Sequence, residues 1–363
     1  MGFQQIRLYQ FRNLKDTTLD VAAGQVFLVG QNGQGKSNFL ETLYLLSYGG
    51  SFRTRRDQEL CRGGTDEMAL DGQFISTDEE LSVSIRFRGG KKTISVDDQN
   101  LTDRRDLVSR IPTVVFRHDD MAFVNGSPDM QRWFVDQTLS MYQPVYIDQL
   151  RRYRRILRNR NQLIRDRRDE GMMAVYDQQL AESGLEIQRE RAQVLQAFNR
   201  VFQEEFHQIS GISGTFVLDY RPGWRGLERP DEVVAHLRSR RAQEEALRTT
   251  TSGPHRDRVL FRLDGMDFLQ RASTGQTRLV SLILRVAQAR FFAEQTGRLP
   301  VLLLDDVLLE LDGEKRARFV GRLPRSEQRI FTFLPGEPYR DYLSEDTLVY
   351  AVSDGTFQRA ERP

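Results

Sequence analysis

Residues 30 to 37 read Gly30-Gln31-Asn32-Gly33-Gln34-Gly35-Lys36-Ser37 and fit the pattern G-x-x-x-x-G-K-[ST]. An apolar run from Val26 to Val29 precedes this stretch, and a run of helical character from Asn38 to Leu46 follows it. A strand, a glycine-rich turn and a helix N-terminus form a phosphate-binding loop, in which backbone N–H groups surround phosphate oxygens. In such a loop Lys36 reaches the β and γ phosphates, and Ser37 is a ligand of Mg²⁺. The stretch therefore predicts a nucleotide-binding α/β fold.

The second element of the predicted site is an acidic strand end in the C-terminal part of the chain. Residues 300–306 read Pro300-Val301-Leu302-Leu303-Leu304-Asp305-Asp306, an apolar strand followed by two carboxylates. We expect Asp305 to hold Mg²⁺ and Asp306 to position or activate water, so that both act with Lys36 in catalysis. About 270 residues separate Lys36 from Asp305, so both parts of the chain must build one head. No N-K-x-D guanine-reading motif is present, which favours ATP.

The residue pattern changes twice along the chain. Up to about residue 116 it has the alternation and turns of strands around one helix, including a hairpin predicted over 81–96. From 128 to 248 it is rich in Gln, Arg, Glu and Leu, which is typical of long amphipathic helices, and an α/β pattern returns from about 253. A length of 363 residues is enough for about two domains. The predicted domains are a head formed by residues 1–125 plus 249–363 and an inserted lobe formed by residues 126–248.

A third motif lies upstream of the acidic strand, where Ser273-Thr274-Gly275-Gln276 opens a predicted helix that runs to about Glu294. This S-x-G-Q element resembles the signature motif of ATP-binding-cassette (ABC) ATPases, and alone it is also typical of a helix N-cap. The resemblance implies that the serine hydroxyl and the helix N-terminus contact the γ-phosphate bound by the opposite protomer. Together the three motifs predict an α/β fold of the ABC-type P-loop ATPase head, with a mixed β core and an inserted, mainly helical second lobe.

Further segments resemble the RecF family of bacterial recombination mediators, and they cover essentially the full chain in the family's motif order. They are Phe11-Arg12-Asn13, Ser51-Phe52-Arg53-Thr54, Gly126-Ser127-Pro128 with Arg132, Gly253-Pro254-His255-Arg256-Asp257, and Leu303-Leu304-Asp305-Asp306-Val307 with Glu310-Leu311-Asp312. The resemblance implies a homodimer that forms with ATP and Mg²⁺ and clamps double-stranded DNA near single-strand gaps or stalled forks. It also implies that RecR and RecO are partners in recombinase loading, in recombinational repair and in the SOS response. Slow ATP hydrolysis would act as a switch.

The resemblance also assigns roles to single residues. It places Arg12 and Asn13 near the nucleotide, together with the loop residues and Asn38. It makes Asp312 the D-loop acid that crosses the dimer interface, and it puts Asp120 at a Q-loop-like position that senses Mg²⁺ and nucleotide state.

Two segments depart from the pattern of the family. RecF-like chains usually read Phe-Ser-Pro-Glu-Asp where this chain reads Phe116-Arg117-His118-Asp119-Asp120. They also tend to have a Thr-rich strand end where this chain reads Phe331-Thr332-Phe333-Leu334-Pro335. The departures leave open how the segment at Asp120 senses nucleotide and whether the second segment contacts the site.

Arginine-rich segments are the candidates for binding DNA. Nine arginines and one carboxylate lie between Arg151 and Arg168, and helical spacing sets many of the arginines opposite the apolar side chains. Such a face would bind backbone phosphates, with strong salt dependence and little sequence preference. The alternative is a solvated face whose arginines pair with acids such as Glu182, Glu186 and Glu190. The candidate residues are Arg53, Arg55, Arg56, Arg151, Arg152, Arg154 and Arg155. The first three follow the helix after the glycine-rich loop, and for them the nucleotide is the alternative ligand.

Composition narrows the class of protein. The formal net charge of +2 does not by itself indicate nucleic acid, but 48 of the 53 basic residues are arginine, the better phosphate ligand. There is no run of 18 apolar residues and no signal-peptide pattern, and the single cysteine excludes an internal disulfide. We expect a cytoplasmic protein without a membrane partner. Two alternatives share the motifs: an ABC transporter ATPase, and an SMC-like head, for which the middle stretch is short.

Overall fold

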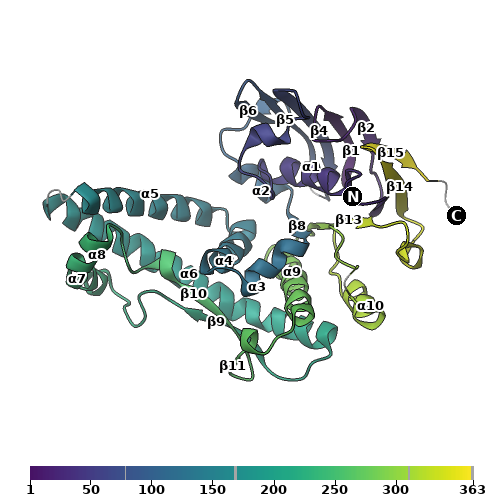
Figure 1. The fold of residues 1–363 in the computed structure, drawn as a ribbon. Coiled ribbons are helices and arrows are strands. Elements are labelled where there is room, and N and C mark those ends of the chain that lie inside the picture. Colours follow the sequence, from purple (N-terminus) through teal and green to yellow (C-terminus); the bar gives the residue numbers. More distant parts are fainter. Residues whose placement is uncertain (78, 167–169, 310, 361–363) are drawn as a thin grey trace. The chain divides into compact units, whose positions relative to one another are not determined.

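The computed structural model describes residues 1–77, 79–166, 170–309 and 311–360, which group into two compact units (Figure 1). The first unit consists of Met1–Asp119 and Gln288–Pro363, and the second consists of Asp120–Ala287. The chain therefore leaves the first unit once and returns to it once. None of the described helices is both long and apolar enough to cross a bilayer.

The limits of these units differ from those of the predicted lobes. Residues 120–125 were predicted in the head but belong to the second unit, where Ala122–Asn125 packs against Pro128–Tyr142. Residues 249–287 were also predicted in the head but group with the second unit. The physical reason is strand pairing, because β10 (Arg258–Leu263) is hydrogen-bonded antiparallel to β9 (Phe216–Arg221), which belongs to the middle of the chain. The expectation of a mainly helical lobe did not include these strands.

The first sheet of the first unit is antiparallel and has the strand order β2-β1-β4-β5-β6-β7. Its side chains alternate between buried and exposed, and the predicted hairpin over 81–96 is confirmed by the β5–β6 pairing. The strands are β1 (Gly2–Tyr9), β2 (Thr17–Asp20), β4 (Glu67–Ile75), β5 (Glu80–Arg88), β6 (Lys91–Val96) and β7 (Gln99–Asn100).

The second sheet of the first unit has the strand order β15-β14-β3-β13-β12-β8 and is parallel except for β15. The strand before the glycine-rich loop, β3, is separated from the acidic strand, β12, by β13. The strands are β3 (Gln25–Val29), β8 (Thr113–Phe116), β12 (Val301–Leu304), β13 (Gln328–Phe333), β14 (Thr347–Ser353) and β15 (Thr356–Arg359). The ends of β3, β13 and β12 therefore lie side by side.

Helix α1 (Lys36–Tyr48) packs against strands of both sheets. Its apolar side chains are buried around most of its circumference, as expected for a helix enclosed in a core. This packing fixes the N-terminus of α1 directly after the loop that follows β3. The other helices of the first unit are α2 (Arg105–Arg110), α10 (Gly313–Gly321) and the 3-10 turns Asp57–Leu60 and Tyr339–Tyr342.

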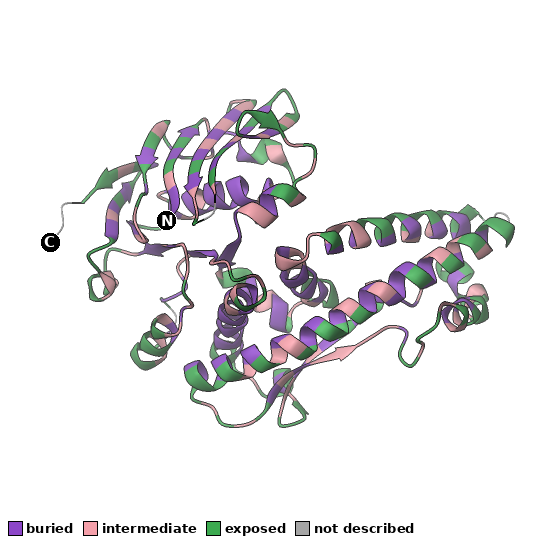
Figure 2. Cartoon of the chain, turned by 180° about the vertical axis from the view of Figure 1, so that it is seen from behind, coloured by how far each residue is buried: buried purple, intermediate pink, exposed green. Residues whose placement is uncertain are grey.

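The second unit is built around two long helices, α5 (Val145–Asp166) and α6 (Glu170–Ser210), which run side by side (Figure 1). Buried and exposed residues alternate along α6, as in an amphipathic helix (Figure 2). Shorter helices and a three-stranded sheet pack around them. These elements are α3 (Ala122–Asn125), α4 (Pro128–Tyr142), α7 (Pro230–Ser239), α8 (Arg241–Leu247), the 3-10 turns Pro254–Arg256 and Phe268–Gln270, and β11 (Met266–Asp267), which pairs with β10 on the side away from β9. The 3-10 turn His118–Met121 and helix α9 (Thr274–Thr296) cross between the two units.

Candidate nucleotide site

The loop from Gly30 to Gly35 joins β3 to α1, as predicted, and other segments of the first unit hold its backbone. The Gly30 N–H donates to Phe333 O at 3.1 Å, and the Asn13 Nδ2 donates to Gly33 O at 2.9 Å. Gly35, at the N-terminus of α1, has φ 115°, and a Cβ there would lie 2.5 Å from Leu14 Cδ2. Only glycine takes this conformation at this close approach without strain.

The structure brings the two predicted motifs together. Ser37 Oγ donates a 2.7 Å hydrogen bond to Asp305 Oδ1, although 268 positions separate them. Lys36 is buried, and its Nζ donates to the loop carbonyls of Gly30 at 2.6 Å and Gln31 at 3.2 Å and lies 4.0 Å from Asp306 Oδ1. The loop lysine, the loop serine and both carboxylates therefore occupy one small volume.

Thr332, at the end of β13, joins this cluster, and the sequence reasoning had left its contact open. Its Oγ1 accepts from the Asp306 N–H at 2.8 Å, donates to Asp306 Oδ1 at 2.8 Å, and lies 3.3 Å from Asp305 Oδ1. Asp306 has φ 49°, a conformation that aspartate tolerates and most residues avoid. The signal that could have revealed Thr332 is its place at the end of a parallel strand, where polar side chains gather at one sheet edge.

The acid pair is electrostatically suited to a divalent cation. Burial raises the pKa of Asp305, with the hydrogen bond from Ser37 acting against the rise and the neighbouring Asp306 charge adding to it. The Ser37 hydroxyl and the Asp305 carboxylate are hard oxygen donors of the kind that Mg²⁺ prefers, and they already lie within hydrogen-bond distance. These residues therefore fit a magnesium ion. Burial also raises the pKa of Glu337, and the Asp306 charge adds to that rise.

The cavity over the loop has a volume of about 180 Å³. Its lining includes Arg53, for which the sequence left open contact with the DNA backbone or with the nucleotide. Arg12 instead lies against α1, where its guanidinium binds Glu41. The lining residues are Gln31, Asn32, Gly33, Gly35, Lys36, Ser37, Asn38, Arg53 and Asp306.

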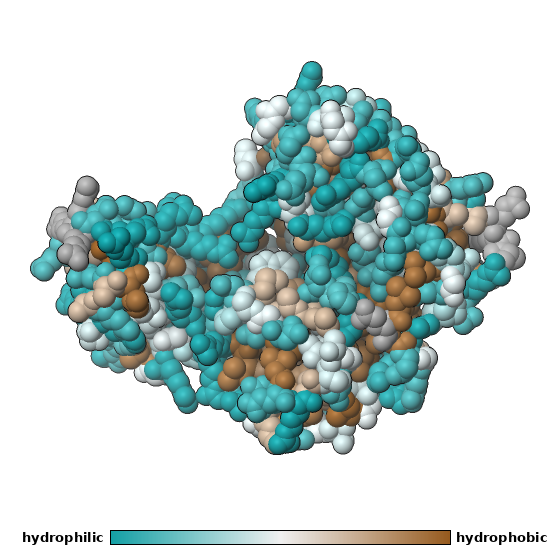
Figure 3. All heavy atoms as spheres, viewed as in Figure 1, coloured by the Kyte–Doolittle hydropathy of each residue, from teal (hydrophilic) through white to brown (hydrophobic). Residues whose placement is uncertain are grey.

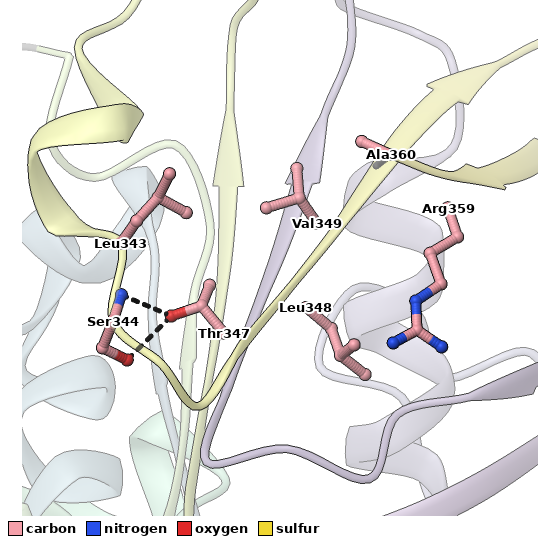
Figure 4. Close-up of a pocket in the computed structure, with 7 residues that line it drawn as sticks. All are labelled: Leu343, Ser344, Thr347, Leu348, Val349, Arg359 and Ala360. Atoms are coloured by element: carbon pink, nitrogen blue, oxygen red, sulfur yellow. Dashed lines mark hydrogen bonds between the residues drawn. The ribbon is translucent and has the colours of Figure 1, made fainter. Parts of the chain in front are cut away.

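A second cavity of the first unit, of about 150 Å³, lies at the C-terminal hairpin (Figure 4). Leu343, Leu348 and Val349 contribute apolar side chains to it, and the Ser344 N–H donates to Thr347 Oγ1 at 2.9 Å. Arg359 is the charged residue of its lining. This cavity shares no lining residue with the one over the loop.

The predicted signature residues Ser273 to Gln276 lie in the second unit, at the N-terminus of α9, and all four are exposed. The Gln276 N–H donates to Ser273 Oγ at 3.2 Å, and the Ser273 N–H donates to Gln276 Oε1 at 2.9 Å. This reciprocal pair is a capping box, so the segment is indeed a helix N-cap. A Cβ on Gly275 would meet only Ser273 Oγ, at 3.9 Å. No described residue therefore requires glycine at this position.

The two remaining acids carried over from the family occupy different settings. Asp120 is buried in the second unit, where its carboxylate accepts from Arg285 Nε at 3.1 Å and Nη2 at 2.9 Å. Asp312 is exposed in the first unit and caps α10, accepting from the Lys315 N–H at 2.9 Å and Nζ at 2.7 Å. These contacts, with Lys315 the main cause, lower the pKa of Asp312. Glu310 lies outside the described residues.

The arginine face of α5 is hydrophilic and exposed (Figure 3). Arg151 pairs with Asp148 at 3.4 Å, whereas Arg152, Arg154 and Arg155 form no ion pair with any residue that the structure describes. The alternative of pairing with glutamates of α6 is not observed for these three. Glu182 and Glu186 instead accept hydrogen bonds from Gln178 and Gln149, each at 2.7 Å. Arg55 and Arg56 are also exposed, and Arg167 and Arg168 lie outside the described residues.

Comparison with known proteins gives consistent results. The RecF/RecN/SMC N-terminal domain family matches residues 3–337. The DNA replication and repair protein RecF of Treponema pallidum (strain Nichols) is 41% identical over 95% of this chain and 97% of its own, and that of Synechococcus sp. (strain JA-3-3Ab) is 33% identical over 92% and 91%. A solved structure of the recombination mediator protein RecF with ATP, in the RecFOR pathway, superposes with a TM-score of 0.89 at 27% identity, covering 99% of this chain and 98% of that one. An SMC head bound to a domain of ScpA, at 16% identity and a TM-score of 0.59, shares the fold.

The fold and the joined motifs define an ABC-type P-loop ATPase head of the RecF/RecN/SMC class, which confirms the predicted fold class. Within that class the chain belongs to the RecF family, as the sequence resemblance indicated.

Proposed function

We propose that this protein is an ATP-dependent DNA-binding switch. A homodimer that forms with ATP clamps double-stranded DNA near single-strand gaps or stalled forks. With RecR and RecO it promotes recombinase loading in recombinational repair and the SOS response, and weak ATP hydrolysis resets it. The names of the relatives and the ATP-bound structural neighbour support this function. We further propose that it acts in the cytoplasm.

The observation that carries the proposal is the junction of the loop with the acid pair. Backbone N–H groups from Gly30 to Asn38 would bind the phosphates together with Lys36. Asn13 and Arg12 would lie behind these groups. Ser37 and Asp305 would hold Mg²⁺, whose chemistry is to neutralise phosphate charge as the γ-phosphoryl group is displaced. Asp306 would position the attacking water and accept its proton, with Thr332 fixing the orientation of the carboxylate.

The signature residues complete the proposed mechanism from a second copy of the chain. Ser273, Thr274, Gly275 and Gln276 are exposed at a helix N-terminus, where N–H groups and the helix dipole favour an anion. Binding of the partner's γ-phosphate there would favour the closed dimer by differential affinity. We propose that Asp312 contacts the partner across this interface and that Asp120 transmits nucleotide state through Arg285.

The DNA contact is proposed on the basic surface of the dimer. Arg152, Arg154 and Arg155 of α5 support it, because they form no ion pair with any described residue and an exposed guanidinium in that state can bind a phosphate. Arg151, Arg152, Arg154 and Arg155 form this surface, with Arg55 and Arg56 as further candidates. Contacts to the backbone would make binding depend on salt and hardly on sequence.

Light scattering with and without Mg-ATP, repeated with gapped duplex DNA, tests the proposal. We expect a monomer that becomes a dimer only with ATP. An Asp306→Asn variant should bind ATP, hydrolyse it slowly and stay on DNA longer than the unchanged protein. A chain whose mass is indifferent to ATP would overturn the proposed clamp, as would an Asp306→Asn dimer that leaves DNA at the unchanged rate.

A further inference from the structure

One buried carboxylate lies on the α1 side of the phosphate-binding loop and is within ion-pair distance of two arginines. Glu41 of α1 is fully buried. Arg12 Nε and Nη2 donate to its two oxygens at 2.9 and 2.8 Å, and Ser51 Oγ donates to Oε1. This fork-like pairing is the strong geometry for a guanidinium and a carboxylate, so Arg12 is the more tightly held partner of Glu41.

The second guanidinium, that of Arg53, is held more weakly. Its Nη1 lies 3.6 Å from Glu41 Oε2, beyond hydrogen-bond distance, and donates to the neutral Asn38 Oδ1 at 2.6 Å. The Arg53 side chain is 40% exposed and lines the cavity over the loop with Lys36 and Asp306. Two positive groups thus share one negative group, and the surplus charge lies at the wall of the cavity.

We propose that Glu41 is a positioning residue that holds Arg53 at the wall of the cavity, so that the phosphates of ATP compete with Glu41 for this guanidinium. The proposal rests on the proposed function in one respect, that the cavity binds ATP. It also gives the two arginines different roles. Arg12 stays on Glu41 and supports the loop flank, whereas Arg53 moves to the nucleotide.

The energetics favour this division. Arg53 leaves a neutral amide and a longer-range attraction and gains charge-assisted hydrogen bonds to phosphate oxygens, which are roughly twice as strong as neutral ones. Arg12 would have to leave two short charge-assisted bonds and strand a buried carboxylate, which is strongly unfavourable. The Glu41 charge therefore lowers the affinity for ATP through Arg53.

The test is Glu41→Gln, which keeps the size of the side chain and removes its charge. Two unit charges 4 Å apart attract each other by about 1 kcal/mol in water, and the Arg53 guanidinium is exposed to solvent. Losing this attraction predicts ATP binding that is about fivefold tighter, measured by titration with a fluorescent ATP analogue. A purely structural role for Glu41 would instead weaken binding. Glu67→Gln, a change at a half-buried residue of β4 outside the cavity lining, is the control and should bind ATP as the unchanged protein does.

The tighter ATP binding of Glu41→Gln should depend on Arg53. Arg53→Ala should weaken ATP binding about tenfold, and Glu41→Gln should bring no gain in that background. Arg88→Ala removes an exposed arginine of β5 as a control. Weaker or unchanged binding by a folded Glu41→Gln, or a gain that persists without Arg53, overturns the proposal. If Glu41→Gln does not fold, equal affinities of Arg53→Ala and Arg88→Ala overturn it. Should the unchanged protein bind no ATP, the proposed function fails instead.

Discussion

The glycine-rich loop and the signature segment are both short motifs at a helix N-terminus, yet their side chains are satisfied in different ways. In the loop, the Ser37 hydroxyl and the Lys36 ammonium bind groups of their own chain, and the Gly35 conformation is forced by its neighbours. In the signature segment, the side chains of Ser273 and Gln276 bond within their own turn, and a Cβ on Gly275 would meet only Ser273 Oγ among the described atoms. The described fold accounts for the glycines of the loop, whereas it does not account for glycine at 275.

The same contrast occurs within one helix. Arg160 of α5 is fully buried and donates to Asp177, Thr250 and Glu244, each at 2.7 Å. Arg155, little more than one turn earlier, is exposed and without an ion pair among the described residues. Position on the helix decides the role, because only one face of α5 meets α6 and α8. Arg160 holds the fold, and Arg155 is available for a ligand.

The largest effect is expected at Arg160. Arg160→Gln leaves the buried Glu244 carboxylate without its cation and leaves Asp177 paired with Arg241 alone, so the free energy of unfolding should fall by about 3–5 kcal/mol. Urea denaturation followed by circular dichroism measures it. A loss below about 1 kcal/mol would contradict the assignment of Arg160 to the folded core.

Gly275→Ala should separate dimerisation from folding. The methyl group would enter the space proposed for the partner's γ-phosphate. Hydrogen bonds from the N-terminus of α9 to this phosphate would be lost, so ATP-dependent dimerisation should be about 30-fold weaker. Stability should be unchanged or slightly raised, because alanine is the better helix former. Light scattering and a thermal melt on the same sample check both. Normal dimerisation would show that the exposed turn has no partner.

Thr332→Val tests the acid cluster. Valine keeps the shape and removes the hydroxyl that binds Asp306, so ATP hydrolysis should slow about tenfold while ATP affinity stays within about twofold. A phosphate-release assay and a binding titration measure the two quantities. Thr332→Ser is the control that restores the hydroxyl, and it should recover most of the rate.

The smallest effect is expected at Arg155. Arg155→Gln removes one phosphate contact, so DNA affinity should fall about threefold and the slope of log affinity against log salt should decrease by about one. Fluorescence anisotropy over a salt series gives both. Arg200→Gln, an exposed change on α6, should leave the slope unaltered. An unchanged slope for Arg155→Gln would place the DNA elsewhere.

Much of the site could be predicted because its motifs are local. A glycine-rich turn between a strand and a helix has one geometry, so residues 30 to 37 specify the loop without knowledge of the remainder of the chain. The signature helix and the hairpin over 81–96 were predictable for the same reason. The 3.6-residue and two-residue periods of the side chains fix the element type locally.

The sequence alone determined the phosphate-binding loop, the acidic strand end and the family, since each is written in consecutive residues. Only the tertiary structure decided their partners. Insertion of β13 between β3 and β12 carries Thr332 to the acid pair, and the pairing of β9 with β10 moves residues 249–287 into the second unit. Glu41 likewise meets Arg12 and Arg53 only because three segments pack together. Strand order and packing depend on contacts between distant residues, and no local pattern encodes them.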